Sequence, residues 1–242
     1  MPPFKLDYLA AKNYYIAPGG LDMNQQQKFD RNEYENHVKN IEKNFPSKLM
    51  LLLQQNNILM SEDLLDYYIN LGFTKFCVGS LSQAKEIRNK LPKAEIIGSI
   101  TMKISLDNLL DDQYEIFDGF VLWFPYNRDY DLISQLPKKY HYILLVNCDC
   151  NITCDGTHHW FATLEQEHHN LCPNSLSQNF KWENIIRIRP MDLSIFDKYI
   201  SYYKFQGRES LTTQILQTFC VYLHNYAMYP EIYATSELYK HK

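Results

Sequence analysis

The chain has 242 residues, of which 45% are hydrophobic and 21% charged, and its net charge at pH 7 is -4. The mean hydropathy of -0.40 and the lack of any apolar run approaching about 18 residues exclude a membrane span. The acidic balance argues against a general nucleic-acid binder, and the length suits one domain covering residues 1–242.

The first residues, MPPFKLDYLAAKNYY, contain no basic stretch leading into an apolar stretch, as a secretory signal would. We therefore expect a cytoplasmic protein whose six cysteines work in a reducing environment.

Short apolar runs alternate with segments of helical periodicity along the whole chain. Capping residues precede four of the periodic segments: Asp30, Ser61, Ser80 and Ser105. Short helices are also predicted at 131–136 and around 193–199, and a longer one at 209–226. The apolar runs predict eight strands, at 13–17, 48–53, 73–79, 94–101, within 114–124, at 141–146, 184–189 and 202–205.

Strands that alternate with helices in this order predict an α/β protein built as a (β/α)8 TIM-like barrel, with a doubly wound open sheet as the alternative. In a barrel, the residues that follow each strand gather at one face, where barrel enzymes place their sites. The residues at these positions are Asn56, Cys77, Ser99, Asn127, Arg128, Asp129, the segment from Cys148 to Cys154, Arg189, Lys204 and Arg208.

A cysteine- and histidine-rich insertion follows the sixth predicted strand. It contains Cys148, Cys150, Cys154 and Cys172 within 25 residues, together with four histidines, among them His158 and His159. Soft thiolates at this spacing suit a metal that prefers sulfur, either zinc or an iron-sulfur cluster. Disulfides would need an oxidising compartment, and thiols scattered by chance occur more often in apolar positions.

Several short motifs resemble those of the peptidase U32 family, whose members are labelled peptidases or collagenases. These motifs lie between residues 92 and 210, in family order. They are Pro92, Ile96 and Ser99; Asn127-Arg128-Asp129; Asn147, Cys150 and Cys154 with His158 or His159; Cys172-Pro173; Ile188-Arg189-Pro190 with Asp192-Leu193; and Lys204 with Gly207-Arg208.

The resemblance implies a TIM-barrel-like fold and a 4Fe-4S cluster bound by cysteines. The better understood relatives act in oxygen-independent hydroxylation, but their cysteine spacing differs from that of this chain, so their substrates do not carry over. Cys148 stands where relatives usually have another residue. The fourth cluster ligand is therefore open between Cys148, Cys77 and His159, and zinc remains the alternative metal.

Three cations at predicted strand ends, Arg189, Lys204 and Arg208, would form a pocket for a carboxylate or phosphate. Asn127, Arg128 and Asp129 are further candidates for substrate binding, although Arg128 and Asp129 can also be an exposed pair that caps the next helix. We expect no peptide-bond hydrolysis, because the chain contains neither G-x-S-x-G nor H-E-x-x-H.

The sequence thus predicts an iron-sulfur barrel protein, a redox or modifying enzyme that acts on an anionic small molecule, a nucleotide or a peptide, with a partner subunit possible. The first alternative is a non-enzymatic binding or assembly module in which zinc fixes the cysteine-rich loop. The second is a U32-type peptidase.

Overall fold

The computed structural model describes residues 14–16, 31–44, 46–53, 62–148, 186–205 and 222. Of residues 14–16 it describes the backbone alone. Most of the cysteine-rich insertion lies outside these ranges, and so does the closing segment apart from Tyr222. The predictions for Cys150, Cys154, Cys172, His158, His159 and Arg208 therefore fall outside the described residues.

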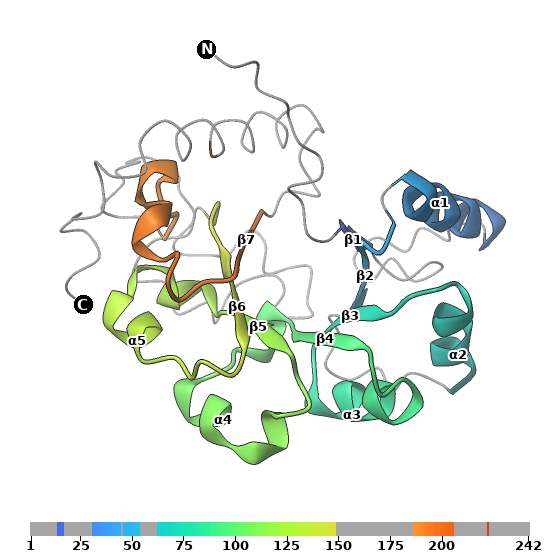
Figure 1. Ribbon diagram of the computed structural model, residues 1–242, viewed down its shortest axis with the longest axis horizontal. Coiled ribbons are helices and arrows are strands. Elements are labelled where there is room, and N and C mark those ends of the chain that lie inside the picture. The colour runs from blue at the N-terminus through green and yellow to red at the C-terminus, as the bar shows by residue number, and fades with distance from the viewer. Residues whose placement is uncertain are drawn as a thin grey trace, which may run out of the picture. The chain divides into compact units, whose positions relative to one another are not determined.

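The described residues form two compact units, and the first contains four parallel strands in chain order. Every residue of β2 is buried, as the unbroken run LMLLL predicts for a strand covered on both faces. The elements, coloured blue to green in Figure 1, are β1 (Tyr14–Ile16), α1 (Arg31–Asn44), β2 (Leu49–Leu53), α2 (Glu62–Asn70), β3 (Lys75–Val78), α3 (Leu81–Lys90) and β4 (Glu95–Gly98).

The second unit contains three more parallel strands, again paired in chain order. Short helices and 3-10 turns connect them (Figure 1). The elements are α4 (Leu106–Leu110), η3 (Asp112–Tyr114), β5 (Gly119–Val121), η4 (Phe124–Arg128), α5 (Tyr130–Ser134), β6 (His141–Leu145), η7 (Pro190–Ile195) and β7 (Tyr202–Lys204). The first unit also includes η2 (Ile100–Met102) and residues Glu115–Asp118, which precede β5.

Side-chain caps begin α3 and α4 at the residues that the sequence indicates. The Ser80 hydroxyl accepts from the Gln83 N–H at 3.3 Å, and the Gln83 side chain accepts from the Gly79 N–H at 3.0 Å. Ser105 and Asn108 form a capping box at the start of α4. These contacts satisfy N–H groups that a helix start otherwise leaves without partners, and they fix where each helix begins.

The alternation of parallel strands with helices confirms the α/β class, and within each unit it is the pattern of a barrel wall. The strand predicted at 184–189 is wrong for its described part, because residues 186–189 form no strand. Instead β7 pairs directly with β6, and Ile188 donates a single backbone hydrogen bond to the Val146 carbonyl at 3.1 Å. Closure into an eight-stranded barrel and the single domain stay predictions.

Among the described helices, none has both the length and the apolar character needed to cross a lipid bilayer.

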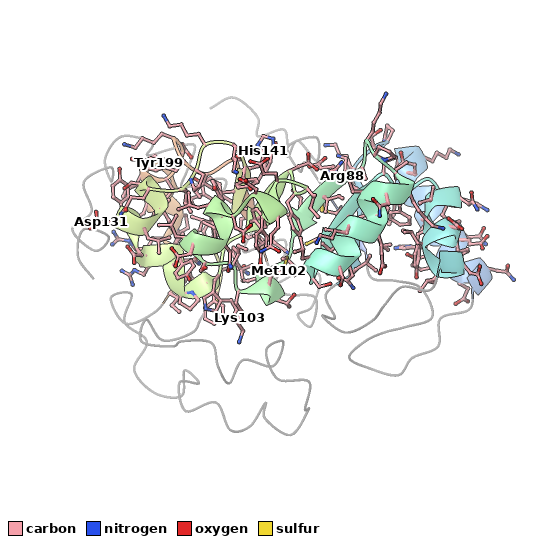
Figure 2. All side chains as sticks on the ribbon, turned by 90° about the horizontal axis from the view of Figure 1, so that it is seen from below. Arg88, Met102, Lys103, Asp131, His141 and Tyr199 are labelled. Atoms are coloured by element: carbon pink, nitrogen blue, oxygen red, sulfur yellow. The ribbon has the colours of Figure 1, made fainter. Side chains whose placement is uncertain are left out.

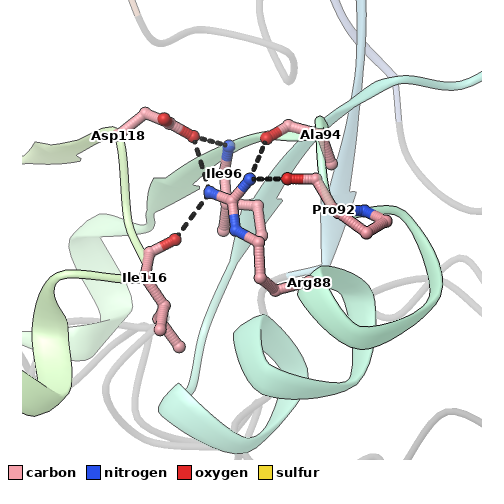
Figure 3. Close-up of polar contacts among 6 residues, drawn as sticks. All are labelled: Arg88, Pro92, Ala94, Ile96, Ile116 and Asp118. Carbon is pink, nitrogen blue, oxygen red and sulfur yellow. Dashed lines mark hydrogen bonds and ion pairs between the residues drawn. The ribbon is translucent and has the colours of Figure 1, made fainter.

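Arg88 of α3 anchors the amino-terminal end of β4 within the first unit (Figure 3). Its guanidinium donates to the carbonyls of Pro92, Ala94 and Ile116 at 2.7–2.9 Å and pairs with Asp118 at 3.0 Å. The same Asp118 oxygen accepts from the N–H of Ile96 at 2.7 Å. One side chain therefore connects α3, the start of β4 and the segment that precedes β5.

Replacement of Arg88 by methionine is expected to lower the free energy of unfolding by about 1–2 kcal/mol, because the hydrogen bonds of the guanidinium are lost. The loss is not larger because water already reaches part of the Arg88 and Asp118 side chains and weakens their ion pair. Arg88 is 26% exposed and Asp118 41%. Urea denaturation measures the change. Lys90→Met is the matched control, since the carboxylate of Asp66 with which Lys90 pairs is 52% exposed. Equal losses in the two variants would contradict the anchoring role.

Candidate functional site

The carboxyl ends of β5, β6 and β7 meet at one edge of the second unit. β5 pairs with β6 up to Val121↔Ile143, and β6 pairs with β7 up to Leu145↔Lys204. Ligands of parallel α/β proteins bind at this edge, because the loops that follow the strands converge there. We call it the strand-end site and define it as residues 122–129, 146–148, 186–189, 204 and 205.

Asn127 is the most deeply buried polar residue of the strand-end site. It lies in η4, whose Pro125 suits the start of a helical turn, and it is fully buried. Its Nδ2 donates to the Leu145 carbonyl at the end of β6 at 2.5 Å, whereas its Oδ1 has no hydrogen-bond partner within the described part of the chain. A buried acceptor without a donor costs about 1–3 kcal/mol, so this oxygen is available to a donor group of a ligand.

Arg128 and Asp129 do not form the exposed pair that the sequence analysis considered as an alternative to substrate binding. Arg128 is only 3% exposed, so its cation is held inside the second unit. Asp129 is the N-cap of α5, with its Oδ1 accepting from the Leu132 N–H at 3.0 Å. Burial and, as a smaller effect, the charge of Asp129 raise the pKa of Tyr126, which keeps that phenol protonated. Asp129 thus has a structural role here, in addition to any contact with substrate.

Cys148 lies three residues beyond the end of β6, and its side chain is fully buried. The backbone of Val146, two residues before Cys148, forms hydrogen bonds with three partners. The Val146 N–H donates to the Lys204 carbonyl at 3.0 Å and its carbonyl accepts from Ile188. The Tyr222 hydroxyl lies 3.0 Å from the Val146 carbonyl oxygen and 2.7 Å from that of Ile188, so these two oxygens share its proton.

Arg189 pairs with Asp192 through two contacts, from Nε at 2.5 Å and from Nη2 at 3.0 Å. Asp192 is fully buried, whereas the Arg189 side chain is 24% exposed. Much of the guanidinium is therefore directed at an internal carboxylate. The structure places Arg189 and Lys204 on segments that both contact the end of β6, and the ligand pocket predicted for them with Arg208 stays a prediction.

Lys103, in the second unit, is a further candidate for the strand-end site that no motif in the sequence indicated. Its φ of +48° is in the left-handed region that non-glycine residues rarely adopt, and its Nζ lies 5.1 Å from the centre of the Trp123 ring. Figure 2 shows Lys103 on the opposite side from His141, which begins β6. Lys103 therefore adds an exposed cation beside the strand-end site, and no periodicity or motif in the sequence indicates its backbone conformation.

Cys77 lies within β3 of the first unit and is fully buried. This position agrees with the interpretation of Cys77 as a small core residue. Within the described ranges, no three metal-binding side chains of the His, Cys, Asp or Glu type come together. That observation does not bear on Cys150, Cys154 and Cys172, which lie outside those ranges.

An open pocket of about 450 Å³ lies on the first unit at α1 and α2. Two of its acidic side chains already have partners. Glu35 accepts from the Tyr67 hydroxyl at 3.2 Å, and Asp66 pairs with Lys90 at 2.6 Å. We assign no chemistry to this pocket.

Comparison with known proteins indicates a fold rather than a close relative. No family model matches the sequence, and neither does a curated protein. A solved structure, described as that of the U32 peptidase Mk0906, superposes with a TM-score of 0.54 over 83% of this chain and 86% of its own, at 9% sequence identity. At this identity the likeness shows a shared fold, which agrees with the resemblance seen in the sequence motifs.

Proposed function

We propose that the chain is an iron-sulfur protein of the U32-like type. It would hold a 4Fe-4S cluster at the strand-end site and act as an oxygen-independent redox or modifying enzyme on an anionic small molecule, nucleotide or peptide. The observation that carries the proposal is the position of Cys148, buried three residues beyond the end of β6, because it brings the chain to the strand-end site directly before the cysteines at 150 and 154 in the sequence. The shared fold with a U32 peptidase structure supports the family part of the proposal.

The donor set suits such a cluster. Iron-sulfur clusters take thiolate ligands, and the sequence supplies four cysteines from Cys148 to Cys172. Cys150, Cys154 and Cys172 would hold the cluster, with Cys148, Cys77 or His159 as the candidates for a fourth ligand. When bound, a cluster supplies single electrons at a potential that its surroundings adjust.

The protein's own groups would bind and orient the substrate. The Asn127 Oδ1 offers a buried acceptor to an N–H or O–H donor of the substrate. Arg128 supplies a buried positive charge in the same turn, and Lys103 an exposed one beside it. Arg189, Lys204 and Arg208 would attract the anionic part of the substrate, and Asp129 would keep η4 joined to α5.

Exposure to air distinguishes this proposal from the zinc-bound alternative. Protein purified without oxygen is expected to be coloured and to bleach in air, because exposed clusters oxidise. A colourless, air-stable protein with one equivalent of zinc would instead support a binding module whose metal only fixes the loop.

Peptidase activity is the weaker alternative, although the solved structure with this fold carries that name. Serine hydrolysis needs a serine hydroxyl beside a histidine that a third group orients. His141 Nδ1 lies 3.3 Å from the Ser201 hydroxyl, but this exposed contact is at the amino-terminal ends of β6 and β7, at the other end of the strands from the strand-end site.

A further inference from the structure

The two ends of the cysteine-rich insertion meet within the second unit. Val146 lies on the near side of the insertion and Ile188 on its far side, and the Ile188 N–H donates to the Val146 carbonyl at 3.1 Å. The chain between these two residues contains Cys148 and the cysteines at 150, 154 and 172. We call the contact between Val146 and Ile188 the insertion base.

Tyr222 contacts both sides of the insertion base. Its hydroxyl oxygen lies 3.0 Å from the Val146 carbonyl oxygen and 2.7 Å from that of Ile188. Its ring meets the Phe205 ring edge to face just beyond β7, with centres 5.1 Å apart. The preceding residue, Lys204, accepts from the Val146 N–H at 3.0 Å. One side chain therefore connects the two ends of the insertion with the end of β7.

The insertion base is dry. Val146 and Ile188 are fully buried, and Tyr222 is only 3% exposed. A hydrogen bond is strong in such surroundings, and a buried carbonyl that loses its donor favours any opening that lets water reach it. The Tyr222 hydroxyl, which serves a carbonyl on each side, therefore opposes separation of the two ends.

We propose that Tyr222 is a positioning residue that keeps the two ends of the insertion together and thereby places its cysteines for metal binding. The inference rests on the proposed function for the role of these cysteines as ligands. A loop with joined ends has fewer conformations than one with separated ends, so its thiolates meet around a metal at a smaller entropic cost. Because such coupling is reciprocal, a bound metal should in turn make the base open less often.

Titration of the metal-free full chain with cobalt(II), followed by the thiolate-to-cobalt absorption band, tests the proposal whether the resident metal is iron or zinc. Tyr222→Phe keeps the ring and removes only the hydroxyl, and its cobalt affinity is expected to fall about tenfold. Tyr142→Phe is the matched control and should bind cobalt as the wild type does. It removes a hydroxyl of an equally buried tyrosine, one that donates to the Pro137 carbonyl at 2.8 Å.

Amide hydrogen exchange at the Ile188 N–H is a second measurement, which needs no metal. Exchange in the metal-free chain should be about tenfold faster in Tyr222→Phe than in the wild type and unchanged in Tyr142→Phe. Bound cobalt should slow it in the wild type.

The outcomes separate this proposal from the proposed function. Equal exchange in the wild type and Tyr222→Phe would overturn the role of Tyr222 at the insertion base. Equal cobalt affinity in these two proteins, or a wild type that binds no cobalt through thiolates, would overturn the positioning of the cysteines. A wild type that binds cobalt more tightly than Tyr222→Phe, but is purified without iron, would contradict the iron-sulfur function and leave the positioning role supported.

Discussion

Replacement of Gly119 by alanine is expected to destabilise the second unit by about 3 kcal/mol or more. Gly119 begins β5 and pairs with His141 of β6. A Cβ atom at this position would lie 2.2 Å from the His141 carbonyl oxygen and 3.0 Å from its carbonyl carbon. These are backbone atoms of a paired strand, so the two strands must separate to admit one methyl group.

Urea denaturation of the variant measures this loss. The matched control is Gly72→Ala, where the added Cβ meets nothing within 4 Å and the cost comes only from a φ of +97°. That control should lose about 1–2 kcal/mol, the usual penalty for an L side chain in the left-handed region. A Gly119 variant no less stable than the Gly72 variant would show that β5 and β6 are not packed as described.

The second large effect is expected on bound iron. Cys150→Ala, Cys154→Ala and Cys172→Ala should each lose most of the iron, because each removes a proposed cluster ligand, whereas Cys148→Ala should keep it. The described geometry supports the difference, since the Cys148 thiol is fully buried beside a backbone held by Lys204, Ile188 and Tyr222. Iron analysis of the four proteins, purified side by side without oxygen, measures the effect.

The pattern of loss also identifies the ligand set. Equal loss in all four variants would mean that four cysteines close the cluster, which would leave no iron open to substrate. Retention of iron in the Cys172 variant would direct the search to Cys77 or His159. Of these two, Cys77 lies within β3 of the first unit, where it is fully buried.

The sequence predicted the helices and strands that depend on local residue patterns, such as apolar runs and helix caps. Continuous apolar runs gave the positions of β2 and β6 to within a residue, and Ser80 and Ser105 gave the starts of α3 and α4. The run at 184–189 misled because Ile186 and Ile188 are buried, although residues 186–189 do not form a strand. An apolar run shows that a segment is buried, and only its neighbours determine how its backbone is bonded.

The strand-end site was predictable in outline, since residues after parallel strands must share an edge. The hydrogen bond from Asn127 to Leu145 was not, because it depends on η4 turning back toward β6. The pair between Arg189 and Asp192 had a sequence signal in its spacing of three residues. Val146 and Tyr222 are 76 residues apart, and no local pattern links them.

The iron and acid-labile sulfide content of the wild-type chain, purified without oxygen, tests the central claim most directly. The proposal predicts about four irons and four sulfides per chain, as a 4Fe-4S cluster requires. One zinc per chain with neither iron nor sulfide would contradict it.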